Sequence, residues 1–224
     1  MTAAAEPSKQ DLSPVVPAGI EKEPILLLDT SGSMSWPTSD GGRVERRALV
    51  GEAMGLLVTK LGAEDSQAEE EAAAGEDAGG LMAVVFSDTN AAEVIGDLSE
   101  TNWRDKWANI QWGGGTNIMP GWSLVIDNYL EEFGDTPKTE RPALLVLVIT
   151  DGEATDIQAF EDECAKAQGG TYICIAIVGY GPEHDRTLTD YQKIAASNNH
   201  VRVVSFESET DPAVVAEALI SLVS

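Results

Sequence analysis

The chain has 224 residues, of which 43% are hydrophobic, so it is long enough to form one large domain with a substantial core. Its 38 acidic and 14 basic residues give a formal net charge of −24. This charge argues against binding to nucleic acids or anionic membranes, because both are themselves negatively charged. No stretch of the sequence predicts a transmembrane helix or a signal peptide, and we therefore expect a cytoplasmic protein.

The N-terminal third predicts an arm, a strand and a helix. Residues 1–23 are rich in proline and are expected to form an extended arm, followed by a domain over 24–224. The first strand is predicted at 25–28, bounded by Pro24. A helix is predicted at 43–61, and we expect small residues on one side of it to pack closely on a sheet, among them Ala48, Gly51 and Gly55.

An acidic segment at 63–79 holds seven acidic residues and no basic one. We expect a solvated acidic linker, or alternatively a loosely held helical extension, inserted in a connection before the next strand. Such an insertion disturbs a sheet little, because connections run over the surface.

The remainder of the chain alternates apolar runs with helical patterns. Strands are predicted at 81–86, 143–149, 171–178 and 201–206, with a hairpin partner at 92–98. Helices are predicted at 103–110, 118–133, 157–168 and 188–197, with a last helix capped by Asp211. This order predicts an α/β fold with a Rossmann-like, doubly wound, mostly parallel six-stranded sheet, one antiparallel edge strand, and helices on both faces.

The two cysteines, Cys164 and Cys174, lack the spacing of a zinc site. We expect both to be small buried thiols in a reduced compartment. A disulfide between the predicted helix at 157–168 and the strand at 171–178 is the alternative.

Three loops near strand ends carry side-chain oxygens. Asp29, Ser31 and Ser33 directly follow the first strand, Thr116 follows three glycines, and Asp151 follows the most apolar run. Ligands bind outside the carboxyl ends of strands in open α/β sheets, and oxygen donors suit a hard cation such as Mg²⁺, Mn²⁺ or Ca²⁺. These five residues are therefore candidate metal ligands; for the two serines the alternative is loop and helix-capping duty.

The motifs Asp-x-Ser-x-Ser at 29–33, Gly-Gly-Thr at 114–116 and Thr-Asp-Gly at 150–152 together resemble those of the von Willebrand factor type A (vWA) domain. The resemblance covers roughly residues 24–222. It implies a metal-ion-dependent adhesion site (MIDAS), in which hydroxyls bind the metal directly and one or both acids act partly through water. An open coordination position would accept an Asp or Glu carboxylate from a partner protein, so the implied function is a metal-dependent protein-binding module without catalytic activity.

Other functions stay open as alternatives. A metal-dependent hydrolase or phosphotransferase would need catalytic machinery that the motifs do not supply, since the chain has no Walker A sequence and no G-x-S-x-G elbow. A nucleotide-binding domain would need G-x-G-x-x-G in its first loop, which is also missing. The resemblance further allows a subunit of a chelatase-like complex with an AAA+ ATPase.

Two tryptophans flank the motif loops. We expect Trp36 or Trp112 to lie on the rim of the site and anchor a partner, unless both pack against the loops. Trp103, Trp107 and Trp122 are instead expected to pack between elements.

Four polar residues have more ordinary expected roles. His184 and His200 are expected to be solvated loop residues. Glu153 and Asp156, close in sequence to Asp151, are expected either to support the site or to lie on the surface.

Overall fold

A six-stranded sheet forms the centre of the molecule, with strand order β3-β2-β1-β4-β5-β6. The computed structural model describes residues 11–39, 41–69, 81–88, 91–179 and 182–223. The strands are β1 (Lys22–Asp29), β2 (Leu81–Phe86), β3 (Glu93–Leu98), β4 (Ala143–Thr150), β5 (Thr171–Val178) and β6 (Val201–Phe206). β3 pairs antiparallel with β2, and the other pairings are parallel. The predicted doubly wound sheet with one antiparallel edge strand is confirmed.

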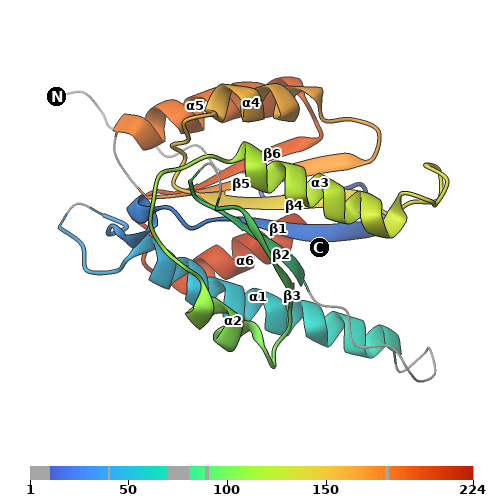
Figure 1. Ribbon diagram of the computed structural model, residues 1–224, viewed down its shortest axis with the longest axis horizontal. Coiled ribbons are helices and arrows are strands. Elements are labelled where there is room, and N and C mark those ends of the chain that lie inside the picture. The colour runs from blue at the N-terminus through green and yellow to red at the C-terminus, as the bar shows by residue number, and fades with distance from the viewer. Residues whose placement is uncertain (1–10, 40, 70–80, 89–90, 180–181, 224) are drawn as a thin grey trace.

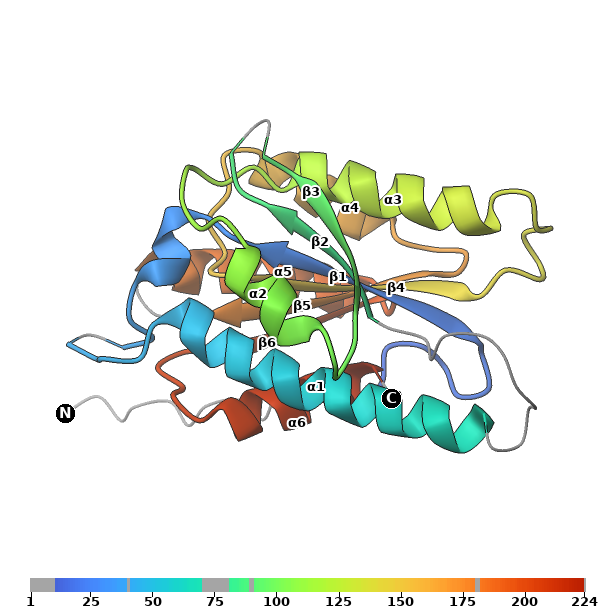
Figure 2. The same cartoon turned by 60° about the horizontal axis from the view of Figure 1, so that its bottom comes forward.

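Helices cover both faces of this sheet (Figure 1). One face carries α1 (Arg46–Glu69), α2 (Trp103–Asn109) and α6 (Pro212–Val223), which lie together at the bottom of the view. The other carries α3 (Met119–Phe133), α4 (Ile157–Lys166) and α5 (Pro182–Ser197). Figure 2 shows the same two layers from another side. Each face of the sheet has its own hydrophobic core, and alternate side chains of β1 point into the two cores. Leu26 and Leu28 lie on the α1 face, and Ile25 and Leu27 lie on the α3 face.

The first strand is longer than predicted. β1 begins at Lys22, so the prediction that Pro24 bounds the strand is wrong. Pairing with β4 starts at Lys22, whereas pairing with β2 starts only at Ile25. Pro24 therefore lies where β1 has one neighbouring strand, a position in which a missing N–H is tolerated. Before the strand, Val15 and Val16 are buried in the core on the α1 face.

The helix α1 also differs from its predicted range of 43–61. It begins at Arg46 and continues to Glu69, so residues 63–69 of the acidic segment are helical. Residues 70–79 of that segment lie outside the described residues.

Two glycines of α1 face tryptophans instead of the sheet. A Cβ at Gly51 would lie 2.8 Å from Nε1 of Trp107, and a Cβ at Gly55 would overlap the ring of Trp103. Both pairs have a spacing of four residues, which places them on one helix face. The expected packing of these glycines on the sheet is wrong: they let the indoles of α2 approach α1 closely. Trp103 and Trp107 do pack between elements, as predicted.

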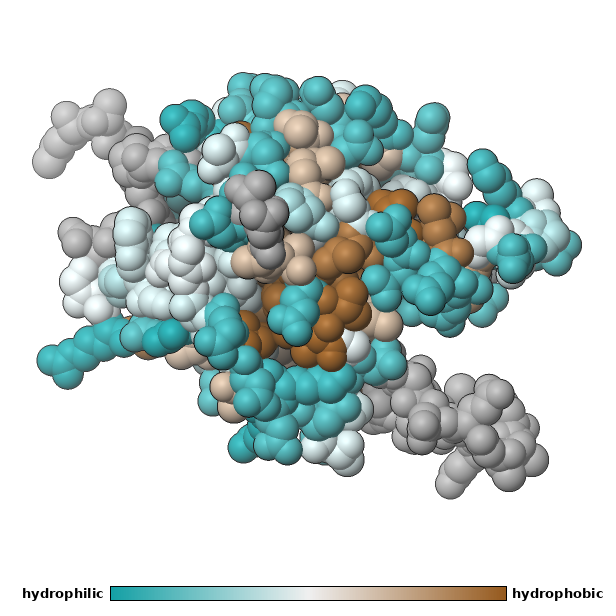
Figure 3. All heavy atoms as spheres, in the orientation of Figure 1, coloured by the Kyte–Doolittle hydropathy of each residue, from teal (hydrophilic) through white to brown (hydrophobic). Residues whose placement is uncertain are grey.

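The outer strand β3 lies beside an apolar patch, which is brown at the centre of Figure 3. Val94 of β3 is 37% exposed. Nζ of Lys106 in α2 donates hydrogen bonds to the carbonyls of Ile95 (3.0 Å) and Asp97 (2.8 Å). An ammonium group on edge carbonyls hinders the addition of another strand, a common protection of sheet edges.

The two cysteines lie in the interior of the molecule, as predicted. Cys164 and Cys174 are free, buried thiols. Over the described parts of the chain, no helix combines the length and apolarity that a membrane span requires.

Candidate metal centre

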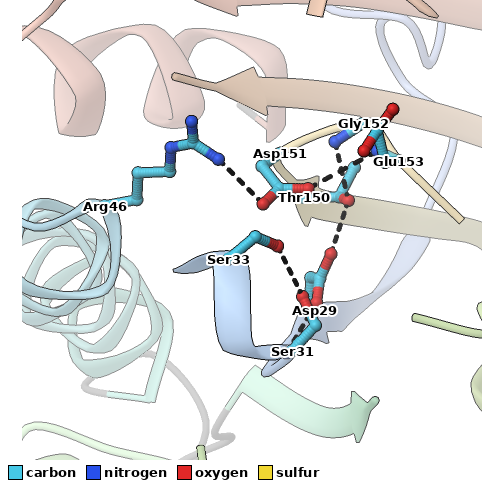
Figure 4. A network of polar contacts seen from close by, with 8 residues as sticks. All are labelled: Asp29, Ser31, Ser33, Arg46, Thr150, Asp151, Gly152 and Glu153. Atoms are coloured by element: carbon cyan, nitrogen blue, oxygen red, sulfur yellow. Dashed lines mark hydrogen bonds and ion pairs between the residues drawn. The ribbon is translucent and has the colours of Figure 1, made fainter. Parts of the chain in front are cut away.

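The candidate site lies at the carboxyl ends of β1 and β4, two neighbouring strands at the centre of the sheet. The chain leaves β1 toward α1 on one face and leaves β4 toward α4 on the other. This divergence makes a topological switch point, the usual ligand position in open α/β sheets. Asp29 is the last residue of β1, and Asp151 directly follows β4 (Figure 4).

Asp29 is fully buried and held at both carboxylate oxygens. Oδ1 accepts a hydrogen bond from the backbone N–H of Ser31 (2.8 Å), and Oδ2 accepts one from Oγ1 of Thr150 (2.8 Å). Burial, with the nearby carboxylate of Asp151 as the second cause, raises the pKa of Asp29 to about 7, although the two hydrogen-bonding partners oppose the shift. Two acids in a buried place need a compensating cation.

The two serine hydroxyls meet beside this carboxylate. Oγ of Ser31 and Oγ of Ser33 are 3.1 Å apart (Figure 4). Ser31 precedes the short 3-10 helix η1 (Gly32–Ser35), yet its side chain makes no capping hydrogen bond there. The capping alternative for Ser31 is therefore not observed, and both hydroxyls belong to the polar cluster around Asp29.

The carboxylate of Asp151 is paired with Arg46, a residue that the sequence analysis did not identify. Nη1 of Arg46 lies 2.8 Å from Oδ2 of Asp151, and the two side chains are only 7% and 3% exposed. Arg46 comes from the start of α1, 105 positions earlier in the chain. A sequence signal exists nonetheless: α1 begins with two arginines, where the helix dipole disfavours positive charge.

The loop that carries Thr116 is tied to both other motif loops. Its Gly113 N–H donates to the carbonyl of Thr30 (2.9 Å), and its Gly114 carbonyl accepts from the N–H of Gly32 (3.2 Å). The carbonyl of Thr116 accepts from the N–H of Thr155 (2.8 Å). Thr116 also lines a pocket of about 340 Å³ together with Gly152, Glu153, Arg186 and Thr187. The backbone thus brings the three predicted loops to one edge of the sheet.

The neighbouring acids have separate roles. Asp156 accepts hydrogen bonds from the N–H groups of Ile118 and Met119 (both 2.9 Å), and so holds the start of α3, just after Thr116. Glu153 forms an exposed ion pair with Arg186 (3.5 Å). Asp156 therefore supports the loop geometry, whereas Glu153 lies on the surface.

The donor set fits a hard divalent cation. The described residues contain no group of three or more His, Cys, Asp or Glu side chains placed to hold a metal. The cluster instead offers the carboxylates of Asp29 and Asp151 and the hydroxyls of Ser31 and Ser33, with Thr116 on the adjoining loop. Few carboxylates combined with neutral oxygens and water suit Mg²⁺ in particular.

The expectation for His184 is wrong. It lies in α5, which begins at Pro182 and not at the predicted 188, and it is 2% exposed. Its Nε2 is 2.8 Å from Oγ of Ser205, while Nδ1 is buried without a hydrogen-bond partner among the described residues. His200 is likewise not simply solvated, because its ring stacks on Tyr172 with centroids 4.5 Å apart.

We expect His184 to make stability depend on pH. Burial lowers its pKa, Arg46 adds to this, and Glu207, Asp185 and Asp151 oppose it. Because the pKa of His184 is lower in the folded state, the unfolded chain takes up a proton first as pH falls below the ordinary pKa of 6.5. The stability that neutral His184 contributes is therefore complete above pH 6.5 and is lost as pH falls. Urea unfolding in EDTA measures this dependence over the range in which histidine titrates, from about pH 7.5 to about pH 5. Over that range the free energy of unfolding should fall more in the parent than in His184→Gln. Equal pH slopes in the two proteins would contradict this expectation.

The two flanking tryptophans differ in exposure. Trp36 is 61% exposed, whereas Trp112 is partly buried, with its ring centroid 5.3 Å from that of Trp107. Trp36 therefore keeps the position expected of a rim residue, and its role in anchoring a partner stays a prediction.

Comparisons with known proteins identify the fold. No family model and no curated protein matches the sequence. Among solved structures, proximal thread matrix protein 1 from the mussel byssus matches with a TM-score of 0.57 and 18% identity over 90% of this chain and 47% of its own, so this chain spans about half the mussel protein. The VWA domain of SpRpn10 matches with a TM-score of 0.57 and 11% identity, over 89% of this chain and 94% of the SpRpn10 domain. Manganese-loaded TRAP protein of Plasmodium vivax matches with a TM-score of 0.56 and 14% identity, over 91% of this chain and 74% of the TRAP chain.

Proposed function

Because the chain has the fold of von Willebrand factor type A domains, we propose that it is a protein-interaction module that works through a bound divalent cation. Asp29, Ser31, Ser33, Thr116 and Asp151 hold Mg²⁺, or Mn²⁺ or Ca²⁺ in its place. The ion keeps one coordination position open for an Asp or Glu carboxylate of a partner protein. The binding domain includes β1 from Lys22, and Val15 and Val16 of the preceding segment pack in its core.

The observation that carries this proposal is the buried pair of Asp29 and Asp151 at the switch point, beside two hydroxyls that approach within 3.1 Å. Arg46 compensates Asp151, whereas the described residues give the fully buried Asp29 hydrogen bonds but no ion pair, so a bound cation would stabilise its carboxylate. A dication with mostly neutral ligands retains net positive charge, so it attracts a further carboxylate. One of the matching structures is described as manganese-loaded, which is consistent with such an ion in this fold.

The same contacts favour binding over catalysis. Both oxygens of Asp29 accept hydrogen bonds, from Ser31 and Thr150, and Oδ2 of Asp151 is paired with Arg46. Both carboxylates are also buried, with Asp29 0% exposed and the Asp151 side chain 3% exposed, so a substrate has little access to either as a general base. The imidazole of His184 is 2% exposed and faces Ser205 instead of solvent.

The partner is a protein with an exposed acidic residue. The net charge of −24 repels an acidic partner at long range, but salt limits that repulsion to about 8 Å at physiological ionic strength. Trp36, 61% exposed and close to η1, offers an aromatic contact beside the ion.

A Mn²⁺ titration tests the proposal. We expect the parent chain to bind Mn²⁺, and Thr116→Ala to bind it about tenfold or more weakly, since it loses one ligand. Binding is followed by electron paramagnetic resonance of free Mn²⁺. A peptide with one central glutamate should then lower the water proton relaxation of the Mn²⁺-loaded parent by displacing bound water, and the matched glutamine peptide should not.

A pull-down of protein partners is the second test of the proposed function. Capture should require metal and Thr116, so it should disappear in EDTA and in Thr116→Ala. Equal capture by both chains with and without EDTA would overturn the metal-dependent mechanism. Turnover of phosphate esters with Mg²⁺ that is lost in Asp151→Ala would instead establish the alternative of a metal-dependent hydrolase.

A further inference from the structure

The strongest unexplained feature beside the site is Arg46. The sequence places two arginines, Arg46 and Arg47, at the start of α1, and the first turn of the helix holds no acidic residue. The positive end of the helix dipole opposes this arrangement. Local choices that conflict with the element they belong to are expected at functional positions.

Arg46 is held in place by its surroundings. Its guanidinium lies 5.8 Å from the ring centre of Trp36 and packs against Gly179, where a Cβ would come within 2.5 Å of Nε. That Nε is buried and has no hydrogen-bond partner among the described residues. The guanidinium is therefore held so that its Nη1 pairs with Asp151, while its Nε meets no acceptor among the described residues.

The ion pair with Arg46 occupies one of the two carboxylate oxygens of Asp151, a candidate metal ligand. Oδ2 of Asp151 lies 2.8 Å from Nη1 of Arg46, whereas among the described residues Oδ1 accepts one long hydrogen bond of 3.4 Å, from the N–H of Glu153 (Figure 4). An ion that binds Asp151 must use Oδ1 beside a fixed positive charge, or displace the guanidinium from Oδ2. Either way, the ion and Arg46 compete for the charge of one carboxylate.

We propose that Arg46 is a built-in competitor of the metal ion: it balances the charge of Asp151 in the metal-free chain and weakens the binding of the divalent cation. This inference rests on the proposed metal site. Its consequence is that the chain stays folded without metal and takes up the ion only at higher concentration than the bare oxygen cluster would require.

Mn²⁺ titration of the full chain and three variants tests this inference. Arg46→Met, which removes the charge and keeps much of the side-chain length, should bind Mn²⁺ about tenfold or more tightly than the parent, since a nearby like charge has been removed. Arg46→Lys, which keeps the charge, should stay within about threefold of the parent. Arg47→Met is the matched control: Arg47 is 38% exposed and pairs with Glu45, so its loss should change affinity by less than about threefold.

Folding of the variants is measured alongside by circular dichroism and thermal unfolding. If Arg46→Met is unfolded in EDTA and folds on addition of Mn²⁺, the ion has replaced the guanidinium, which supports the proposal. If that variant does not fold at all, Arg46→Gln, neutral and able to donate to Asp151, is titrated in its place.

Two results would overturn the inference, and they differ in what else they affect. If the parent binds Mn²⁺ and the neutral Arg46 variant binds it equally or more weakly, Arg46 positions Asp151 instead of competing, and the proposed function stands. If neither protein binds Mn²⁺, both the inference and the proposed metal site are wrong.

Discussion

The variant Asp151→Ala should lose about 3–5 kcal/mol of stability in the absence of metal, because removal of one partner leaves the other charge buried and unpaired. The remaining partner is the guanidinium of Arg46, whose side chain is 7% exposed. Urea unfolding in EDTA measures the loss. The variant should also gain no stability from Mg²⁺, whereas we expect the parent to gain it by mass action.

A double-mutant cycle separates the buried pair from the rest of the site. Arg46→Met combined with Asp151→Ala removes both charges, and should recover most of the stability that Asp151→Ala loses. Glu153→Ala is the control, because its ion pair with Arg186 has side chains 54% and 71% exposed and should contribute about 1 kcal/mol or less. A loss below about 1 kcal/mol in Asp151→Ala would show that the buried pair is not formed in solution.

The variant Gly121→Val should destabilise the chain by about 2–3 kcal/mol, as expected for overpacking in a close-packed core. A Cβ at Gly121 of α3 would lie 2.8 Å from Cδ1 of Leu27 and 2.9 Å from Cβ of Phe86. The second of these atoms is attached directly to the backbone of β2 and cannot turn away. The helix must therefore move from the sheet, and urea unfolding records the cost.

The same variant should disturb the candidate site, because Thr116 precedes α3 by only a few residues. Ser123→Val places the same side chain on the exposed face of the same helix and should change stability by no more than about 0.5 kcal/mol. Mn²⁺ affinity should fall in Gly121→Val and stay unchanged in Ser123→Val. A stability loss in Gly121→Val no larger than in this control would mean that the contact with Phe86 is looser than the structure shows.

The sheet was predictable because its signal is local. Each buried strand is a continuous apolar run, and the alternation with helices fixes a parallel arrangement. Errors arose where a residue type was read without its neighbours: Pro24 is compatible with a strand because β2 pairs only beyond it. The start of α5 at Pro182 was missed although proline suits a first helical position.

The polar network around the site was less predictable. The motif residues Asp29, Ser31 and Ser33 are close in sequence, and β-strand order explains why Asp151 joins them. Arg46 and Asp156 reach partners that are 105 and about 38 positions away, and no local pattern specifies such a pairing. The burial of His184 depends in the same way on β6, which supplies Ser205.

The hydrogen bond from Thr150 to Asp29 joins positions 121 apart in the chain and therefore has a kinetic consequence. Such a contact closes a long loop, and it forms only when β1 and β4 have already come together. A group that binds here requires the central pairing of β1 with β4 to be in place already, and therefore does not help to nucleate it. Occupancy of this cluster should consequently slow the unfolding rate while leaving the refolding rate almost unchanged.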